Sequence, residues 1–327
     1  MQPRKFAAQR LLMAIAMPAM LTVTTGTTVY AQSGELTVYS SHAEPVSKAL
    51  TEGFNERYPE IDVTLLRLVT GNLATRFANE AVSGVNAADV IIIATPVVFE
   101  ENPEWFRPLS GVEAYDDWPD DLKTENHAKA VFAESLIFYN TNNVSEEESP
   151  KAWSDLLDPK WKGRITLVDP SSAETYMSWA FHIRETFGDE FLTTLAKQDL
   201  TIAKGGVDAA QAVASGAADI AVPPAATHAT ALLKQDAPIG IVPVGQPTLG
   251  NETSIAIAAK APNPENAQIF LEWYLSEEGQ GIACAEVSSS GLGDVSGCLP
   301  FASDYVTPEF GISEAEAAEI MALLGMR

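Results

Sequence analysis

Short apolar runs alternate with segments in which apolar residues recur every three or four positions. Residues 36–39, 61–68 and 90–93 are runs of the first kind and predict strands; the unbroken run 90–93 is typical of a strand buried on both faces. Helices are predicted to start at Pro45, with an apolar stripe at four-residue spacing, and over residues 72–83. This alternation predicts an α/β fold with mainly parallel sheets covered on both faces.

A second set of elements repeats this pattern, with strands at 165–168, 200–203 and 220–222 and helices at 172–187 and 207–215. In both sets a glycine-containing loop opens a helix that ends at Ser-Gly, and Ala-Asp then precedes a buried strand. The shared design predicts two lobes of one architecture. We expect residues 32–134 with 256–327 to form the first lobe and 135–255 the second. Strands at 135–140 and 253–258 are expected to cross between them.

The first 31 residues have the pattern of a cleaved signal peptide. Arg4, Lys5 and Arg10 precede an apolar run at 11–23, and a small-x-small pattern ends at Ala31. The run is shorter than the roughly 20 residues of a spanning helix. No cysteine follows it before Cys284, so we expect export to the periplasm without a lipid anchor.

The remaining chain is strongly acidic. It holds 17 basic residues against 44 acidic ones, a formal charge of −27, because the first 31 residues contain three of the twenty basic residues and no acidic residue. Such a surface repels phosphate backbones and anionic headgroups, which excludes nucleic acid and membrane surfaces as expected partners.

Two cysteines, Cys284 and Cys298, lie in a stretch rich in glycine and serine. In an oxidising compartment they predict a disulfide. A metal site is the alternative, but none of the four histidines falls within fifty residues of either cysteine, so we expect no metal and no cofactor.

Several short motifs carry a family resemblance. They are Leu-Thr-Val-Tyr-Ser-Ser at 36–41, Phe-Tyr-Asn-Thr at 138–141, Trp-Ser-Asp-Leu-Leu at 153–157, Trp-Lys-Gly-Arg-Ile at 161–165 and Phe-Leu-Glu-Trp-Tyr-Leu-Ser at 270–276. In this order the chain resembles periplasmic binding proteins of the ferric-iron and phosphorylated-solute type. The resemblance implies a two-lobed type II (Venus flytrap) fold with two interlobe crossing strands and a ligand in the cleft. It also implies an ATP-binding-cassette permease of the inner membrane as partner; we expect a monomer.

One stretch departs from this resemblance. Iron-binding members carry adjacent tyrosines after the strand that corresponds to 220–222, whereas this chain reads Pro-Pro-Ala-Ala-Thr-His at 223–228. Without phenolate oxygens a hard ferric ion loses the ligands that this type of site uses. The departure argues against iron as the ligand.

Candidate ligand contacts lie in loops at the carboxyl ends of the predicted strands, where α/β sheets bind ligands. These loops offer hydroxyls, amides and backbone N–H groups at helix N-termini, which favour an anionic ligand, with Arg67 as the expected counter-charge. N-capping is the alternative role of these residues. The predicted contacts are Ser40, Ser41, His42, Arg67, Thr70, Gly71, Asn72, Thr95, Ser171, Ser172, Gly205, Gly206 and His228.

No catalytic role is predicted for any residue. The chain lacks a His-Glu-x-x-His helix, a Gly-x-Ser-x-Gly elbow and a Gly-Lys-Ser/Thr phosphate loop. The sequence thus predicts a binding protein for a small organic solute that carries a phosphate, phosphonate or carboxylate. Ferric ion, a cationic solute such as thiamine or a polyamine, and a ligand sensor of the same fold are the alternatives.

Overall fold

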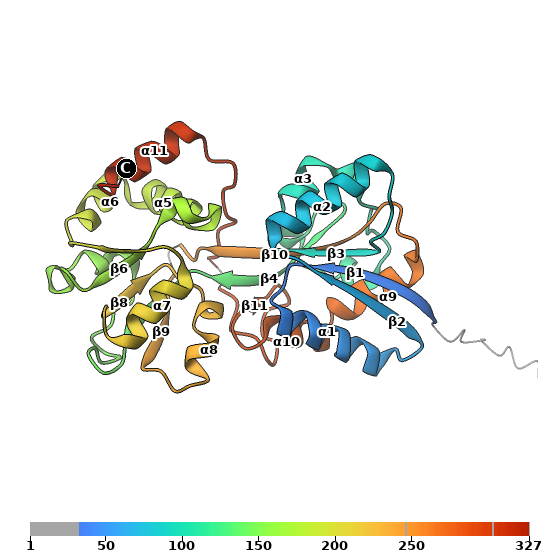
Figure 1. Cartoon of the computed structure of the whole chain (residues 1–327), viewed down its shortest axis with the longest axis horizontal. Helices are drawn as coiled ribbons and strands as arrows, with labels where there is room; N and C mark the ends of the chain where they lie inside the picture. The colour runs from blue at the N-terminus through green and yellow to red at the C-terminus, as the bar shows by residue number, and fades with distance from the viewer. Residues whose placement is uncertain (1–32, 246, 303, 327) are drawn as a thin grey trace, which may run out of the picture. The chain divides into compact units, whose positions relative to one another are not determined.

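The strands form two sheets, each with helices on both faces (Figure 1). The computed structural model describes residues 33–245, 247–302 and 304–326, and the predicted signal peptide lies outside them. The first sheet has the strand order β11-β4-β10-β3-β1-β2. Its strands are β1 (Gly34–Ser40), β2 (Ile61–Arg67), β3 (Val90–Ile93), β4 (Ala128–Glu134), β10 (Gly250–Ile257) and β11 (Ser289–Ser290).

The second sheet has the order β7-β6-β8-β5-β9. Its parallel pairs are β6 with β7 and β6 with β8, and β5 runs antiparallel to β8 and β9. These strands are β5 (Leu136–Asn140), β6 (Ile165–Val168), β7 (Thr201–Ala203), β8 (Ile220–Val222) and β9 (Ile239–Pro243). The two-lobed α/β fold predicted from the sequence is therefore confirmed.

Helices connect these strands. The α-helices are α1 (Glu44–Arg57), α2 (Thr70–Ser83), α3 (Val97–Glu101), α4 (Glu113–Asp116), α5 (Glu174–Phe187), α6 (Asp189–Ala196), α7 (Gly206–Ser215), α8 (Thr230–Leu233), α9 (Pro264–Tyr274), α10 (Glu277–Cys284) and α11 (Glu314–Leu323). The 3-10 helices are η1 (Pro103–Trp105), η2 (Asp120–Leu122), η3 (Trp153–Leu157), η4 (Pro159–Trp161), η5 (Pro170–Ser172) and η6 (Ala226–His228).

Alternation along the strands of the first sheet builds two cores. Val90 and Ile92 pack with α1 and α9, whereas Ile91 and Ile93 pack with α2 and α3. Side chains of a strand point alternately to its two faces, so a strand of four apolar residues serves both layers. Figure 1 shows α2 and α3 on one face of this sheet and α1 and α9 on the other.

The second sheet is built in the same way. Ile137 of β5 packs with α5, α6 and α11, and Phe138 packs with α7 on the opposite face. The small residues Ala209, Ala210 and Val213 let α7 lie close to the sheet. The predicted strand and helix pattern for this part of the chain is confirmed.

Three segments connect the two sheets. β4 continues into β5 through Ser135, and β9 leads to β10 through residues 244–249. The third connection runs from Leu299 to α11, and its Val306 N–H donates to the carbonyl of Thr248 at 2.9 Å. A buried ion pair joins the segments, because Lys129 Nζ of β4 lies 3.1 Å from Glu252 Oε2 of β10 and 3.3 Å from Thr307 Oγ1.

Two segments pack on the other lobe than the predicted boundaries place them in. α11, expected in the first lobe, packs on α5 and α6 through Ile320 and Leu324, and Glu319 pairs with Arg184 at 3.3 Å. β10 begins at Gly250 and pairs only with β3 and β4 among the described strands, so residues 250–255 belong to the first sheet. In both places packing partners, rather than position along the chain, decide the lobe.

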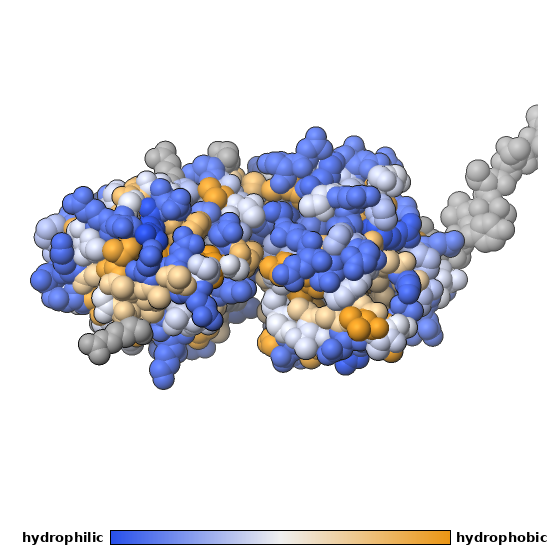
Figure 2. Space-filling view, turned by 90° about the horizontal axis from the view of Figure 1, so that it is seen from above, coloured by the Kyte–Doolittle hydropathy of each residue, from blue (hydrophilic) through white to orange (hydrophobic). Residues whose placement is uncertain are grey.

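The surface fits the acidic composition. Figure 2 shows a face that is largely hydrophilic, with apolar residues scattered over it. Among the described residues, no helix is long and apolar enough to cross a bilayer.

Cys284 and Cys298 form the disulfide that the sequence predicted. It links the end of α10 to the segment after β11, and Cys284 is fully buried. We expect no free thiol in denatured, unreduced protein. The double variant Cys284→Ala/Cys298→Ala should unfold with a free energy lower by about 3 kcal/mol, as the closure of a loop of this length implies. Urea denaturation measures this; reduced wild-type protein is the control, and equal stability of oxidised and reduced protein would contradict the prediction.

His127 should make the fold sensitive to acid. Burial, aided by the charge of Lys129, lowers its pKa from 6.5 to about 4. The unfolded chain then binds a proton at higher pH than the folded one, so stability declines as pH falls from about 6.5 to about 4, by up to about 3 kcal/mol from this group. Urea denaturation at several pH values should show a shallower decline in His127→Gln. An unchanged decline would rule out this group as a cause.

Candidate ligand-binding cleft

The strands that cross between the lobes form the floor of a cleft. Ala133 of β4 lies opposite Asn251 of β10, and both line a hollow of about 240 Å³ that we call the inner chamber. Ser135 lines it too, whereas Glu134 faces a different hollow, as strand alternation requires. The inner chamber is lined by Ala133, Ser135, Ala173, Thr175, Tyr176, Pro223, Ala225, Thr227, His228 and Asn251.

A larger hollow of about 720 Å³, the outer chamber, adjoins the inner one. Ala173, Thr175 and Asn251 line both, so the two chambers adjoin, and we call them together the cleft. Its walls come from both lobes and from the third connection. The outer chamber is lined by Thr70, Gly71, Ala74, Thr75, Ala78, Ala94, Thr95, Val97, Val98, Glu101, Asn102, Trp105, Ala173, Glu174, Thr175, Asn251, Phe310 and Gly311.

Hydrogen bonds fix the direction of the Tyr176 hydroxyl proton. The Ala225 N–H donates to His228 Nδ1 at 2.9 Å, and burial lowers the pKa of His228, so its ring is neutral with the proton on Nε2. Nε2 lies 3.4 Å from Tyr176 Oη, which also accepts the Gly206 N–H at 3.1 Å. With both lone pairs of Oη engaged, the hydroxyl proton is left to donate into the inner chamber.

Gly206 makes room for this arrangement. A Cβ at Gly206 would lie 2.4 Å from His228 Nδ1, closer than any real contact of this kind. Only glycine at this first residue of α7 lets the imidazole stack against the backbone. Gly206 therefore supports the chamber from behind rather than lining it.

Two long helices open onto the cleft without a side-chain cap. α2 follows Val69 and α5 follows Ala173, and neither residue offers a side-chain oxygen to the first turn. The N–H groups of a first helical turn have no partner within the helix and carry partial positive charge. In α5 the Tyr176 N–H donates to the Ala173 carbonyl at 3.0 Å, so the donors left at the cleft are those of its first two residues and of the α2 turn.

Asn251 adds an acceptor. Its Oδ1 is buried, and no described residue donates a hydrogen bond to it. A buried amide oxygen without a donor costs about 1–3 kcal/mol, so this atom favours a ligand that brings an O–H or N–H group.

Four of the residues predicted from the sequence line the cleft. Thr70, Gly71 and Thr95 line the outer chamber, and His228 lines the inner one.

The loop after β1 is occupied by internal contacts. Ser41 Oγ accepts the Ala94 N–H at 2.9 Å, and Ser40 Oγ lies 3.0 Å from Ser47 Oγ. His42 Nε2 lies 2.9 Å from the Tyr274 hydroxyl, and burial lowers the pKa of His42 to about 4. None of Ser40, Ser41 and His42 lines either chamber.

Arg67, the expected counter-charge, also lies outside both chambers. Its Nε donates to the His42 carbonyl at 3.0 Å, and the residue is exposed. No lysine or arginine is among the lining residues of either chamber.

The remaining predicted contacts surround the cleft without lining it. The hydroxyls of Ser171 and Ser172 donate to Asp169, which caps η5. Asn72 is exposed on α2, and Gly205 precedes α7. For this group the predicted role in ligand binding stays a prediction.

Several lining residues were not predicted as ligand contacts. They are Glu101, Asn102, Trp105, Thr175, Tyr176, Asn251 and Phe310. Their sequence contexts differ, but Thr175 and Tyr176 closely follow the predicted contacts Ser171 and Ser172. Asn251 could have been found from its place beside a predicted crossing strand.

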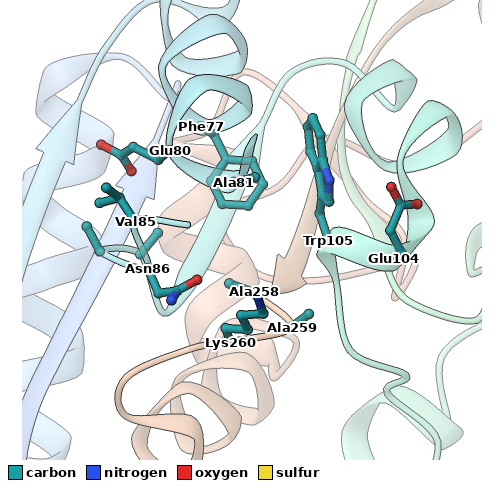
Figure 3. A pocket seen from close by; sticks show the side chains of 12 residues that line it. Phe77, Glu80, Ala81, Val85, Asn86, Glu104, Trp105, Ala258, Ala259 and Lys260 are labelled. Carbon is teal, nitrogen blue, oxygen red and sulfur yellow. The ribbon is translucent and has the colours of Figure 1, made fainter. Parts of the chain in front are cut away.

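A separate hollow lies in the first lobe, and Trp105 lines both this hollow and the cleft (Figure 3). Phe77 and Trp105 line it, with Glu80, Glu104 and Lys260 among their neighbours. Within residues 33–326, positions 246 and 303 aside, no group of three or more His, Cys, Asp and Glu side chains is placed to hold a metal ion.

Comparison with known proteins agrees with this architecture. The chain is 27% identical over 270 residues to Iron uptake protein A1 of Synechocystis, which covers 76% of this chain and 73% of the relative. The structure of iron-bound HitA from Pseudomonas aeruginosa matches with a TM-score of 0.65 and 20% identity, over 89% of this chain and 98% of HitA. AfuA from Actinobacillus pleuropneumoniae with bound fructose-6-phosphate matches with a TM-score of 0.60 and 18% identity, over 90% and 97%.

Two α/β lobes around a cleft, joined by crossing strands, form the type II periplasmic-binding-protein fold. Residues 35–281 match the model of the bacterial extracellular solute-binding protein family, and the chain belongs to this family. It is the solute-binding component of an ATP-binding-cassette importer and not an enzyme. Membership implies a small-molecule ligand, a permease as partner and a periplasmic location.

The contact between Gly206 and His228 can be tested by stability. Gly206→Ala should lower the free energy of unfolding by about 1–3 kcal/mol, because the new methyl group displaces the imidazole. Gly205→Ala is the matched control, since a Cβ there meets no heavy atom within 4 Å. Urea denaturation compares the two, and equal losses would show that the imidazole does not need this space.

Proposed function

We propose that the importer takes up a small organic solute whose anionic group, a phosphate, phosphonate or carboxylate, binds in the inner chamber. The observation that carries this proposal is the Tyr176 hydroxyl, whose proton the His228 and Gly206 contacts leave for a ligand. A hydrogen bond to an ionised acceptor is about twice as strong as one between neutral groups.

The first turn of α5 supports the same assignment. Ala173 and Thr175 line the inner chamber, and the N–H groups of this turn have no side-chain cap. A helix N-terminus attracts anions through free donors and the helix dipole. The inner chamber is lined by no carboxylate side chain that would oppose an anion.

Ferric ion is the alternative that the named relatives raise. In this chain residues 223–228 supply one imidazole and no phenolate oxygen. His228 Nδ1 already accepts the Ala225 N–H, and its Nε2 faces Tyr176. These engaged atoms support an organic anion rather than a bare trivalent cation.

The mechanism follows from the two walls of the cleft. A solute that contacts α5 from one lobe and the crossing strand β10 from the first sheet binds a closed form more tightly than an open one. The permease then distinguishes the loaded from the empty protein by this closure.

Calorimetry on protein stripped of ligand by unfolding and refolding tests the proposal. Inorganic phosphate and citrate should bind to the wild-type protein. Tyr176→Phe should lower the affinity for inorganic phosphate by about tenfold, because it removes one charge-assisted hydrogen bond. Tyr58→Phe is the control, because Tyr58 caps the C-terminal end of α1 and lines neither chamber; it should bind phosphate as the wild type does. Small-angle scattering should show a smaller radius of gyration with bound anion.

Tight binding of ferric nitrilotriacetate without any response to phosphate, citrate or fructose 6-phosphate would overturn the assignment. So would a phosphate affinity that is the same in Tyr176→Phe and wild type.

A further inference from the structure

Beside the uncapped first turns of α2 and α5, the outer chamber carries side chains that the inner one lacks. Glu101 and Glu174 line it with the aromatic rings of Trp105 and Phe310, and no lysine or arginine is among its lining residues. Neither glutamate forms an ion pair or hydrogen bond through its side chain with another described residue. The chamber therefore presents two carboxylates that lack a cation.

The four side chains come from separate elements. Glu101 ends α3 and Trp105 ends η1 in the first lobe, whereas Glu174 begins α5 in the second. Phe310 lies on the third connection, which is fixed to α5 because the Glu309 N–H donates to Ser178 Oγ at 2.8 Å. A group bound among them contacts both lobes.

Trp105 is held in place from behind. Its ring packs edge to face on Phe77, with centroids 6.1 Å apart, in the separate hollow of Figure 3. Trp105 lines the outer chamber as well as the separate hollow. A fixed aromatic surface beside carboxylates is the arrangement that attracts organic cations, by about 0.5–2 kcal/mol per ring.

We propose that the outer chamber is a subsite for an organic cation, so that the solute is zwitterionic: its anionic group lies in the inner chamber and its ammonium group lies between Glu101, Glu174 and the aromatic rings. This inference rests on the proposed function, because the inner chamber supplies the position of the anionic end. The two chambers adjoin through Thr175 and Asn251, so one small molecule spans both.

The carboxylates of Glu101 and Glu174 link the binding of a cation to the closure of the two lobes. Glu101 and Glu174 belong to opposite lobes, so closing an empty cleft brings like charges together. A bound cation turns this repulsion into attraction to both walls. The ammonium group thus favours the closed form beyond what the anionic group does alone.

Three probes separate the two subsites by calorimetry: inorganic phosphate for the inner chamber, choline for the outer one, and phosphocholine, which joins both groups. Phosphocholine should bind at least about tenfold more tightly than either part. Glu101→Gln should lower the affinity for choline and for phosphocholine by about tenfold and leave the affinity for inorganic phosphate unchanged. Glu104→Gln is the matched control, an exposed glutamate three residues away that lines the separate hollow, and should change none of the three.

The two proposals fail in different ways. Choline that does not bind, phosphocholine no tighter than inorganic phosphate, or equal effects of Glu101→Gln and Glu104→Gln would overturn the cation subsite and leave the inner chamber intact. If Tyr176→Phe left the phosphate affinity unchanged while Glu101→Gln still lowered the choline affinity, the assignment of the anionic group to the inner chamber would be wrong and the cation subsite would stand.

Discussion

The pairing of β4 with β10 is the constraint on which both lobes depend. Each strand belongs to the first sheet and is directly connected to a strand of the second, and Lys129 and Glu252 join them in the interior. Burial raises the pKa of Glu252, and the neighbouring charge of Lys129 offsets part of this rise. Removal of one partner from such a pair costs about 3–5 kcal/mol, which makes this pair a fixed point between the lobes.

The position of these paired strands decides which residues line the cleft. Asn251, the neighbour of Glu252 on β10, lines the inner chamber together with the first turn of α5. The donors of the inner chamber come mainly from the second lobe, whereas Glu101 and Trp105 of the outer chamber come from the first. A ligand that fills both chambers would therefore contact both lobes.

Local sequence patterns predicted most of the helices and strands, because the type of each element follows from the spacing of apolar residues within its own segment. The buried strand at 90–93 and the α7 segment with its small residues are examples. α11 could not be assigned to a lobe in this way, because its alanines and glutamates carry little apolar signal and its partners on α5 and α6 lie over a hundred residues earlier. Strand β4 went unrecognised although its residues are almost all buried.

The sequence by itself determined the class of protein: two α/β lobes, a binding role and a disulfide. Only the tertiary structure decided which polar atoms are free. Arg67 donates to the His42 carbonyl, and the Ser171 and Ser172 hydroxyls donate to Asp169. Tyr176 and Glu101 face the cleft instead. The physical reason is that a hydrogen-bonding group serves a ligand only where the fold gives it no other partner, and such partners come from distant parts of the chain.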